Sequence, residues 1–309
     1  MRGQVYPSIQ IPQVKFDEFE EAKILRKAMK GLGTDEKSIF NVASSHNAEE
    51  RFLISRAYAS STGYPIQTSF GADFAGNAGI LMQQLFDNRY YQWLDYVDNL
   101  VEEKRVITAV ILMSDHDLPF INQTLKNLAR RDFYNEYKGH FPISDWGRLL
   151  CGWVSSYSRR DWDPVVAADE LYAAAKGAGT NEDLFIKYLS NTTHECFAKI
   201  CDAYQNKYSK TLRETIKKEF SFKSQYAYLL AHDYMINPLN AIAFAINYSM
   251  KGLGTDDASL IALTALFSDY YRGEQIVQAY RQYGDLKKDI KGDTKGRYQD
   301  ALLKQWGLE

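Results

Sequence analysis

A lysine followed by Gly-x-Gly-Thr occurs three times in this chain, and this repetition constrains the fold more than any other feature. The motif spans residues 30–34, 176–180 and 251–255. Its second glycine falls at positions 33, 179 and 254, so successive copies are 146 and 75 residues apart. Because 146 is about two periods of 73, one copy has lost its motif, and the chain is predicted to contain four units of about 73 residues.

The predicted units fill the chain after a short N-terminal segment. The missing motif should fall near residue 106, and residues 101–106 contain no glycine. The second unit is therefore predicted to have a degenerate loop. The segment and the four units are predicted to comprise residues 1–15, 16–90, 91–162, 163–237 and 238–309.

Apolar residues three or four positions apart lead into the first motif, which is typical of an amphipathic helix. They are Phe16, Phe19, Ala22, Leu25 and Met29. Strand signals are weak along the whole chain. We therefore expect an all-α fold in which each unit places a tight loop between two helices.

Polar residues indicate where helices begin. Asp163 and Asn237 each precede a proline, which is typical of an N-cap followed by proline at the first helical position. The motif glycines are expected to end the preceding helices, because glycine adopts the left-handed conformation that a helix end requires. The threonines of the motif are expected to cap the helices that follow: Thr34, Thr180 and Thr255.

An acidic residue follows each motif at a nearly constant interval. Counted from the second glycine, it lies 40, 40 and 39 residues downstream, at Asp73, Glu219 and Asp293. The last carbonyl groups of a helix have no partner within it, and a glycine-rich turn can direct them to a common point. Such carbonyls and a carboxylate are the hard oxygen ligands that calcium prefers. The pattern therefore favours calcium-binding loops over loops that only join two helix caps.

A site with about five protein oxygens leaves calcium coordination open, because the ion takes six to eight ligands. A lipid phosphate could complete the coordination, and the ion and the membrane would then raise each other's affinity. Leu32 and Leu253, at two loop tips, either enter the membrane interface or pack on their own repeat. Lys30, Lys176 and Lys251 either contact phosphate or are simply solvated.

Composition excludes several classes of protein. The net charge is −2 over 309 residues, so no global positive field attracts nucleic acid or lipid. No apolar stretch approaches the roughly 18 residues of a membrane span, and the N-terminus lacks a signal-peptide pattern. The protein is therefore expected to touch a membrane without crossing it. Cys151, Cys196 and Cys201 are interpreted as reduced thiols of a cytosolic protein.

The motif sequences resemble those of the annexin family. They are MKGLGTDE at residues 29–36, KGAGTNED at 176–183, MKGLGTDD at 250–257 and KGDTKGRYQDALL at 291–303. The resemblance covers nearly the whole chain beyond the first 15 residues. It implies four repeats of five helices each in a curved disc, a right-handed superhelix, with calcium loops that face the membrane from the convex side.

The resemblance also implies the ligands of each calcium ion, three backbone carbonyls and one carboxylate per site. The implied sets are Met29, Gly31 and Gly33 with Asp73 in the first repeat, Ala175, Gly177 and Gly179 with Glu219 in the third, and Met250, Gly252 and Gly254 with Asp293 in the fourth.

The second repeat departs from the family pattern. It keeps a possible acidic ligand in Asp145 but lacks the glycine turn, so no site of this kind is predicted there. This departure and the 22 tyrosines fit a divergent member similar to the alpha-giardins, unicellular annexins that are associated with membrane and cytoskeleton.

The sequence therefore predicts calcium-dependent binding to anionic phospholipid membranes by a peripheral cytoplasmic protein at the inner face of the plasma membrane or the cytoskeleton. It is expected to be a monomer in solution without a nucleic-acid partner; assembly on the membrane and a cytoskeletal partner stay open. No catalytic residue is predicted, because the five histidines lack metal-ligand spacing and His194-Glu195-Cys196 is interpreted as packing. The alternative is a calcium-independent helical scaffold for cytoskeletal partners, whose binding would survive chelation.

Overall fold

The regular secondary structure of the chain is α-helical wherever the structure describes it, apart from a single bridge between Arg160 and Thr192. The expectation of an all-α fold is confirmed. None of the described helices combines the length and the apolar character needed to cross a bilayer. The computed structural model describes residues 16–31, 33–89, 91–93, 103–113, 122–123, 126–127, 132, 143–155, 159–176, 179–252, 254–269 and 272–309.

The described helices form two compact units. The middle unit, Trp93–Ala241, contains α7 (Glu103–Leu112), α10 (Asp145–Ser155), α11 (Pro164–Ala174), α12 (Glu182–Asn191), α13 (His194–Tyr208), α14 (Leu212–Glu219) and α15 (Phe222–Ile236). The terminal unit, Tyr6–Gln92 with Ile242–Glu309, contains α1 (Glu18–Ala28), α2 (Glu36–Ser45), α3 (Ala48–Thr62), α4 (Ile66–Asp73), α5 (Asn77–Leu85), α17 (Asp257–Phe267), α18 (Arg272–Tyr280), α19 (Leu286–Asp293) and α20 (Gly296–Gln305). Helix α16 (Pro238–Ser249) runs from the end of the middle unit into the terminal unit.

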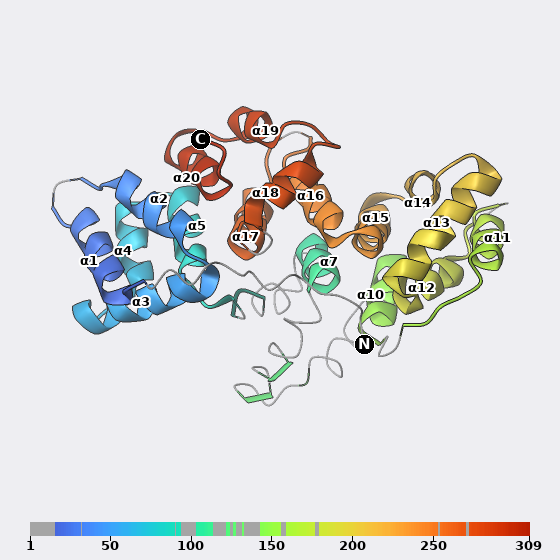
Figure 1. Cartoon of the computed structure of the whole chain (residues 1–309), viewed down its shortest axis with the longest axis horizontal. Coiled ribbons are helices and arrows are strands. Elements are labelled where there is room, and N and C mark those ends of the chain that lie inside the picture. The colour runs from blue at the N-terminus through green and yellow to red at the C-terminus, as the bar shows by residue number, and fades with distance from the viewer. Residues whose placement is uncertain are drawn as a thin grey trace. The chain divides into compact units, whose positions relative to one another are not determined.

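The two units share one packing scheme. In the terminal unit α5 packs on α17 and α2 packs on α20, and in the middle unit α15 packs on α7 and α10 packs on α12 (Figure 1). Each of these pairs joins helices from different predicted repeats. The first repeat is therefore packed with the fourth, and the second with the third.

Two helices are apolar around most of their circumference and form the cores of their units. Helix α17 buries every residue from position 260 to 267, and α15 buries every residue from position 226 to 235. A helix that is apolar on all sides must be covered on all sides. Among the described helices, α17 packs on α5, and α15 packs on α7, α10, α12, α13 and α14.

Arg51 of α3 is fully buried and ties three helices together. Its Nε donates to the carbonyl of Leu85 (2.6 Å), and its Nη1 donates to those of Ala43 (3.2 Å) and His46 (2.5 Å). One guanidinium thus satisfies carbonyls at the ends of α2 and α5, which have no partner within their own helices. Burial lowers the pKa of Arg51, and the ion pair with Asp269 at 3.3 Å opposes that effect.

The proline-linked helix starts are confirmed. Asp163 Oδ1 accepts hydrogen bonds from the N–H groups of Val165 (2.9 Å) and Val166 (3.0 Å), and Asn237 Oδ1 accepts one from Leu239 (3.0 Å). These side chains occupy donors that a helix leaves unpaired in its first turn. Helix α1 begins in the same way at Asp17, so all three helices that precede the predicted loops begin at a side-chain cap.

The predicted amphipathic helix is confirmed as α1, and its apolar stripe is only partly buried. Ala22 and Leu25 are buried as expected, together with Ala28, but the side chain of Phe19 is 52% exposed. The spacing of apolar residues fixes the period of a stripe, while neighbouring helices decide how much of its edge is covered.

Candidate metal-binding loops

Three loops of the same construction connect α1 to α2, α11 to α12 and α16 to α17, and we call them the first, third and fourth loops after their predicted repeats. In each, the residue that caps the second helix donates its N–H to the carbonyl of the last residue of the first helix. The three bonds are Asp35 to Ala28 (2.9 Å), Asn181 to Ala174 (2.9 Å) and Asp256 to Ser249 (2.7 Å). The repeated motif therefore builds one closed loop three times.

The caps of the second helices are Asp35, Asn181 and Asp256, one residue later than the predicted threonines. Asp35 accepts hydrogen bonds from the hydroxyl (2.7 Å) and the N–H (3.2 Å) of Ser38, and these bonds lower the pKa of Asp35. Asp256 binds Ser259 in the same way. The prediction that the threonines cap these helices is wrong. Threonine, asparagine and aspartate all cap helices, and the N–H of the residue after the threonine, not that of the threonine, makes the hydrogen bond that closes the loop.

The motif glycines adopt a backbone conformation that other residues avoid. A Cβ added at any of the described ones would meet nothing within 4 Å. The dihedral angle, and not crowding, therefore requires glycine here. The φ angles are 115° at Gly31, 93° at Gly33, 119° at Gly179, 115° at Gly252 and 85° at Gly254.

Most of the predicted carbonyl ligands lie in these loops without a hydrogen-bond donor. A carbonyl in a closed loop that has no donor is available to a cation. Gly177 and the loop-tip residues Leu32 and Leu253 lie outside the described residues. Within the described ranges, no N–H or hydroxyl donates to the backbone oxygens of Met29, Gly31, Gly33, Ala175, Gly179, Met250, Gly252 or Gly254.

The three predicted carboxylates occupy equivalent positions, because Asp73, Glu219 and Asp293 are the last residues of α4, α14 and α19. Thr180 Oγ1 donates to Glu219 Oε2 at 3.4 Å, and Thr255 Oγ1 donates to the backbone oxygen of Asp293 at 3.2 Å. These bonds place the end of α14 against the third loop and the end of α19 against the fourth loop.

At the first loop, the end of α4 is linked to the loop through Arg297 of α20. Its Nη1 donates to the backbone oxygen of Asp73 at 3.5 Å, and its Nε forms an ion pair with Glu36, the first residue of α2. The structure therefore brings the end of α4 and the start of α2 to one guanidinium group. Sequence patterns gave no signal for this contact, since Arg297 follows Asp73 by 224 residues.

The fourth loop lies in an acidic environment. Burial raises the pKa of Asp293, and the charges of Asp289 and Asp257 raise it further. A cation near Asp293 would offset this repulsion. No group of three or more His, Cys, Asp or Glu side chains in the described part of the chain is arranged to hold a metal ion. A metal held by these loops would therefore depend on backbone carbonyls together with one carboxylate.

The predicted lysines are exposed, and one of them has an aromatic neighbour. Lys30, Lys176 and Lys251 are solvent-exposed. The Nζ of Lys176 lies 5.9 Å from the ring centre of Tyr172, which stacks on Tyr208 with ring centres 3.7 Å apart. Spacing along the sequence could not reveal the stacked tyrosines, because Tyr172 belongs to α11 and Tyr208 to α13.

The second repeat has a helix where its missing motif was predicted. Helix α7 covers residue 106, so the chain makes no loop at that position. Residues 94–102, which precede α7, lie outside the described residues. The predicted acid Asp145 is the first residue of α10, and its carbonyl accepts a hydrogen bond from the Tyr228 hydroxyl at 3.2 Å. The prediction that this repeat holds no site of the same kind stays a prediction.

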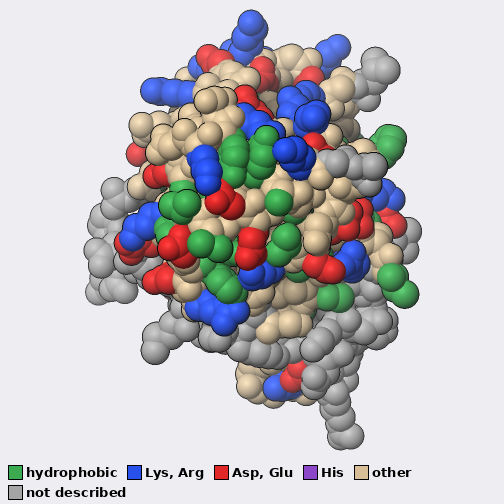
Figure 2. All heavy atoms as spheres, turned by 90° about the vertical axis from the view of Figure 1, so that its right-hand side faces the viewer, with side chains coloured by type: hydrophobic (Ala, Val, Ile, Leu, Met, Phe, Trp, Pro, Cys, Tyr) green, Lys and Arg blue, Asp and Glu red, His purple; other side chains and the backbone are tan. Residues whose placement is uncertain are grey.

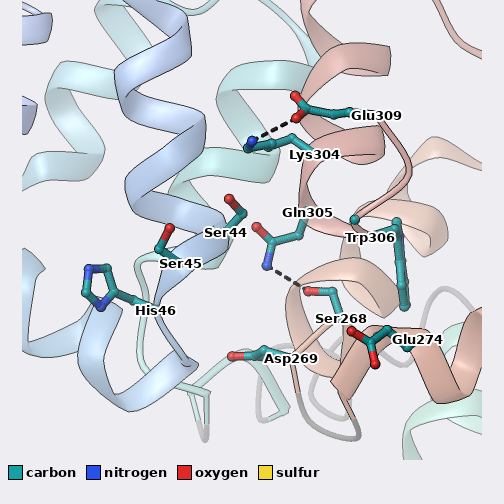
Figure 3. Close-up of a pocket in the computed structure, with 12 residues that line it drawn as sticks. Ser44, Ser45, His46, Ser268, Asp269, Glu274, Lys304, Gln305, Trp306 and Glu309 are labelled. Carbon is teal, nitrogen blue, oxygen red and sulfur yellow. Dashed lines mark hydrogen bonds and ion pairs between the residues drawn. The ribbon is translucent and has the colours of Figure 1, made fainter. Parts of the chain in front are cut away.

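A pocket of about 480 Å³ lies in the terminal unit, between the ends of α2 and α20 and the residues that follow α17 (Figure 3). Several of its polar groups are paired with one another. Lys304 forms an ion pair with Glu309 at 2.7 Å, and Gln305 donates to the Ser268 hydroxyl at 2.9 Å. His46, at its edge, pairs with Glu50 at 3.3 Å. The pocket shares no residue with the three loops.

One arrangement of reactive side chains escaped the sequence analysis. Cys201 Sγ lies 3.8 Å from His232 Nε2, and His232 Nδ1 lies 2.9 Å from Asp233 Oδ1. Burial raises the pKa of the Cys201 thiol, which keeps the thiol protonated. Asp233 is also held by Arg213, with Nη2 to Oδ2 at 2.7 Å. The arrangement therefore links α13, α14 and α15 through buried polar side chains.

Comparison with known proteins places the chain in a family. The annexin family model matches residues 20–85, 166–229 and 243–304. Annexin A7 of Dictyostelium discoideum is 26% identical over 299 residues, which cover 92% of this chain and 63% of that protein. Human annexin A4 is 28% identical over 301 residues, which cover 93% and 94%. The chain spans just under two thirds of the length of the annexin A7 relatives that it matches.

Solved structures agree with this placement. Chicken annexin V superimposes with a TM-score of 0.83 at 25% identity, over 95% of this chain and 96% of that one. A calcium-bound alpha-14 giardin gives a TM-score of 0.83 at 19% identity, over 94% and 99%, which shows a common fold. The family model covers more than half of the residues of the chain. The chain therefore belongs to the annexin family, whose members generally bind calcium and phospholipid.

Proposed function

We propose that this protein binds acidic phospholipid membranes through calcium ions held in its first, third and fourth loops. The observation that supports the proposal is one construction used three times. Each loop is closed by the same hydrogen bond, contains at least one glycine with positive φ, and has an acid at the end of a neighbouring helix. A structure that only joins two helix caps needs neither the unpaired carbonyls nor the acid.

The residues that would hold calcium are the carbonyls of the loop and one carboxylate. In the first loop these are Met29, Gly31 and Gly33 with Asp73, and the third and fourth loops use the equivalent residues. One carboxylate against a divalent ion leaves the site with a net positive charge, so the calcium affinity without lipid is expected to be low. A lipid phosphate adds both an oxygen ligand and negative charge, and it therefore raises that affinity.

The charge distribution of the protein supports a bridge made by cations. The net charge is −2, and basic and acidic side chains are interspersed on the face of the middle unit seen in Figure 2. Such a surface has little attraction of its own for an acidic membrane. Calcium in the loops would add positive charge at the surface that contacts the membrane. The exposed lysines beside the loops would contact lipid phosphate: Lys30, Lys176 and Lys251.

The proposal places the protein in the cytoplasm, peripheral to the inner face of the plasma membrane or to the cytoskeleton. Leu32 and Leu253, at the loop tips, would enter the interfacial region of the bilayer. Binding through several loops at once would strengthen attachment by avidity without new contacts. Membrane binding requires no enzymatic step and no nucleic-acid partner.

Sedimentation with vesicles tests this function. The protein is mixed with phosphatidylserine vesicles over a calcium titration, and the sedimented fraction is compared with that of Asp73→Asn, Glu219→Gln and Asp293→Asn. Each substitution removes one carboxylate and should raise the calcium concentration for half-maximal binding by about three- to tenfold. A chelator should release the protein.

The matched control is Glu195→Gln, which removes a carboxylate from an exposed ion pair on α13, where Glu195 is 82% exposed. It should leave the calcium titration unchanged. Sedimentation that is indifferent to calcium and chelator would contradict the proposal and favour the calcium-independent scaffold.

A further inference from the structure

Arg297 lies where the first loop ends. It is the second residue of α20, and its guanidinium pairs with Glu36, the residue at which α2 begins. The same group donates to the backbone oxygen of Asp73 at 3.5 Å, and Asp73 is the proposed carboxylate ligand of this loop. The Arg297 side chain is 52% exposed and that of Glu36 is 27% exposed. A positive charge is thus held between the end of the loop and the residue that supplies its carboxylate.

Arg148 has the same place in the middle unit. It belongs to the first turn of α10 and forms ion pairs with Glu182, at 3.8 Å, and with Asp183. These two acids begin α12, directly after the third loop. The packing of α10 on α12 corresponds to that of α20 on α2. Both arginines follow a glycine in the sequence, at residues 147–148 and 296–297.

In the described part of the chain, no arginine forms an ion pair with Asp256 or Asp257, the acids that follow the fourth loop. Its second helix, α17, begins with Asp257 after the cap Asp256, and it packs on α5. Helix α5 has the sequence NAGILMQQL, which contains no charged residue. Asp289 and Asp293 on α19 add negative charge on the other side of the loop. The three loops are alike in backbone, but the charges around them differ.

We propose that Arg297 and Arg148 set an order of filling among the calcium sites. They lower the calcium affinity of the first and third loops, and the fourth loop therefore fills at the lowest calcium concentration. This inference rests on the proposed function and adds to it a regulation of the same sites. The protein would then attach first through its fourth loop and recruit the others as calcium rises.

The sign and the size of the effect follow from Coulomb's law. A unit positive charge about 8 Å from a divalent ion weakens its binding by roughly fivefold in water without salt, and by about twofold at physiological ionic strength, where the Debye length is about 8 Å. Removal of Arg297 also releases Glu36 from its ion pair and leaves that carboxylate uncompensated near the loop. Both consequences raise calcium affinity.

Proteins with one intact site isolate each loop. Glu219→Gln with Asp293→Asn leaves the first loop, Asp73→Asn with Asp293→Asn leaves the third, and Asp73→Asn with Glu219→Gln leaves the fourth. Calcium affinity is measured without lipid, by displacement of terbium followed by luminescence. The fourth-loop protein should bind calcium with the highest affinity. Arg297→Gln should tighten binding by the first loop about two- to fivefold, with the larger factor at low salt, and Arg148→Gln should act in the same way on the third.

Two further variants of the first-loop protein separate charge from structure. Arg297→Lys retains the charge and should bind calcium nearly as weakly as the parent, whereas Glu36→Gln leaves the arginine uncompensated and should weaken binding. The matched control is Lys304→Gln, which removes one positive charge from the other end of α20, about 10 Å along the helix. It should not change the affinity. Thermal unfolding followed by circular dichroism checks that each variant folds.

The outcomes distinguish this inference from the function on which it rests. If no single-site protein binds calcium or terbium, the proposed function fails and the inference fails with it. If the sites bind calcium but Arg297→Gln changes nothing, or Lys304→Gln changes as much, the inference alone is overturned. Tighter binding in Arg297→Gln and Arg148→Gln, weaker binding in Glu36→Gln and highest affinity in the fourth-loop protein would support it.

Discussion

At the scale of single residues, the loops were predictable because their chemistry is local. The motif glycines and the downstream acids could be located by counting, and the structure gives the glycines the positive φ that such a turn needs. The cap could not be located in the same way. Thr34 and Asp35 are adjacent and both can cap a helix, so only the closing hydrogen bond to Ala28 selects Asp35.

The first prediction concerns Gly31, whose φ is 115°. Gly31→Ala should lower the free energy of unfolding by about 1–2 kcal/mol, because an L-residue is strained there even though a Cβ would have free space. Gly292→Ala is the control, since Gly292 lies within α19, has no positive φ and also has room for a Cβ. It should be neutral or slightly stabilising. Urea unfolding in calcium-free buffer measures both variants, and equal effects would contradict the role of the dihedral angle.

At the scale of helices, counting along the sequence located individual positions but not the helices that pack against each other. The position of Glu219 could be counted from Gly179, and it lies at the end of α14 with its carboxylate near Thr180. The ion pair of Arg297 with Glu36 and the link between Arg213 and Asp233 could not be found, because they depend on which helices pack together. Contacts between helices are decided by the burial of whole faces and not by short motifs.

The link between α14 and α15 should make stability depend on pH. Burial raises the pKa of Asp233, but hydrogen bonds from His232 and Arg213 lower it more, so its pKa in the folded protein is below 3.8. A carboxyl group with a depressed pKa stabilises the fold above its unfolded pKa, and this contribution is lost as the pH falls through the folded pKa. Asp233→Asn should therefore cost about 2–3 kcal/mol at pH 7 and progressively less below about pH 4.

Denaturant unfolding at several pH values checks this prediction. Lys199→Gln provides the control, because it breaks an ion pair whose side chains are 60% and 82% exposed, and it should cost at most about 0.5 kcal/mol. A loss of stability in Asp233→Asn that stays constant down to acidic pH would show that the carboxylate charge is not the cause.

At the scale of the whole molecule, the chain folds as two compact units that do not follow the sequence order of the repeats. The terminal unit combines residues from both ends of the chain, and the middle unit contains those between them. Repetition in the sequence predicted four similar repeats, but it carried no information on which repeats pack together. The repeat boundaries at residues 90, 162 and 237 stay a prediction. Helices of different predicted repeats pack on each other within each unit, as α5 does on α17, so the packing does not separate one repeat from the next.

The central claim is that calcium and an acidic membrane bind this protein through the same loops, and the most direct test measures their mutual dependence. Bound calcium per chain is determined by equilibrium dialysis with phosphatidylserine vesicles, with phosphatidylcholine vesicles and without lipid. Linkage requires that phosphatidylserine raise the calcium affinity by the same factor by which calcium raises the vesicle affinity. We predict that both factors are well above one for the intact chain and fall together to about one in the variant that combines Asp73→Asn, Glu219→Gln and Asp293→Asn. Calcium binding that is unaffected by phosphatidylserine would contradict the account.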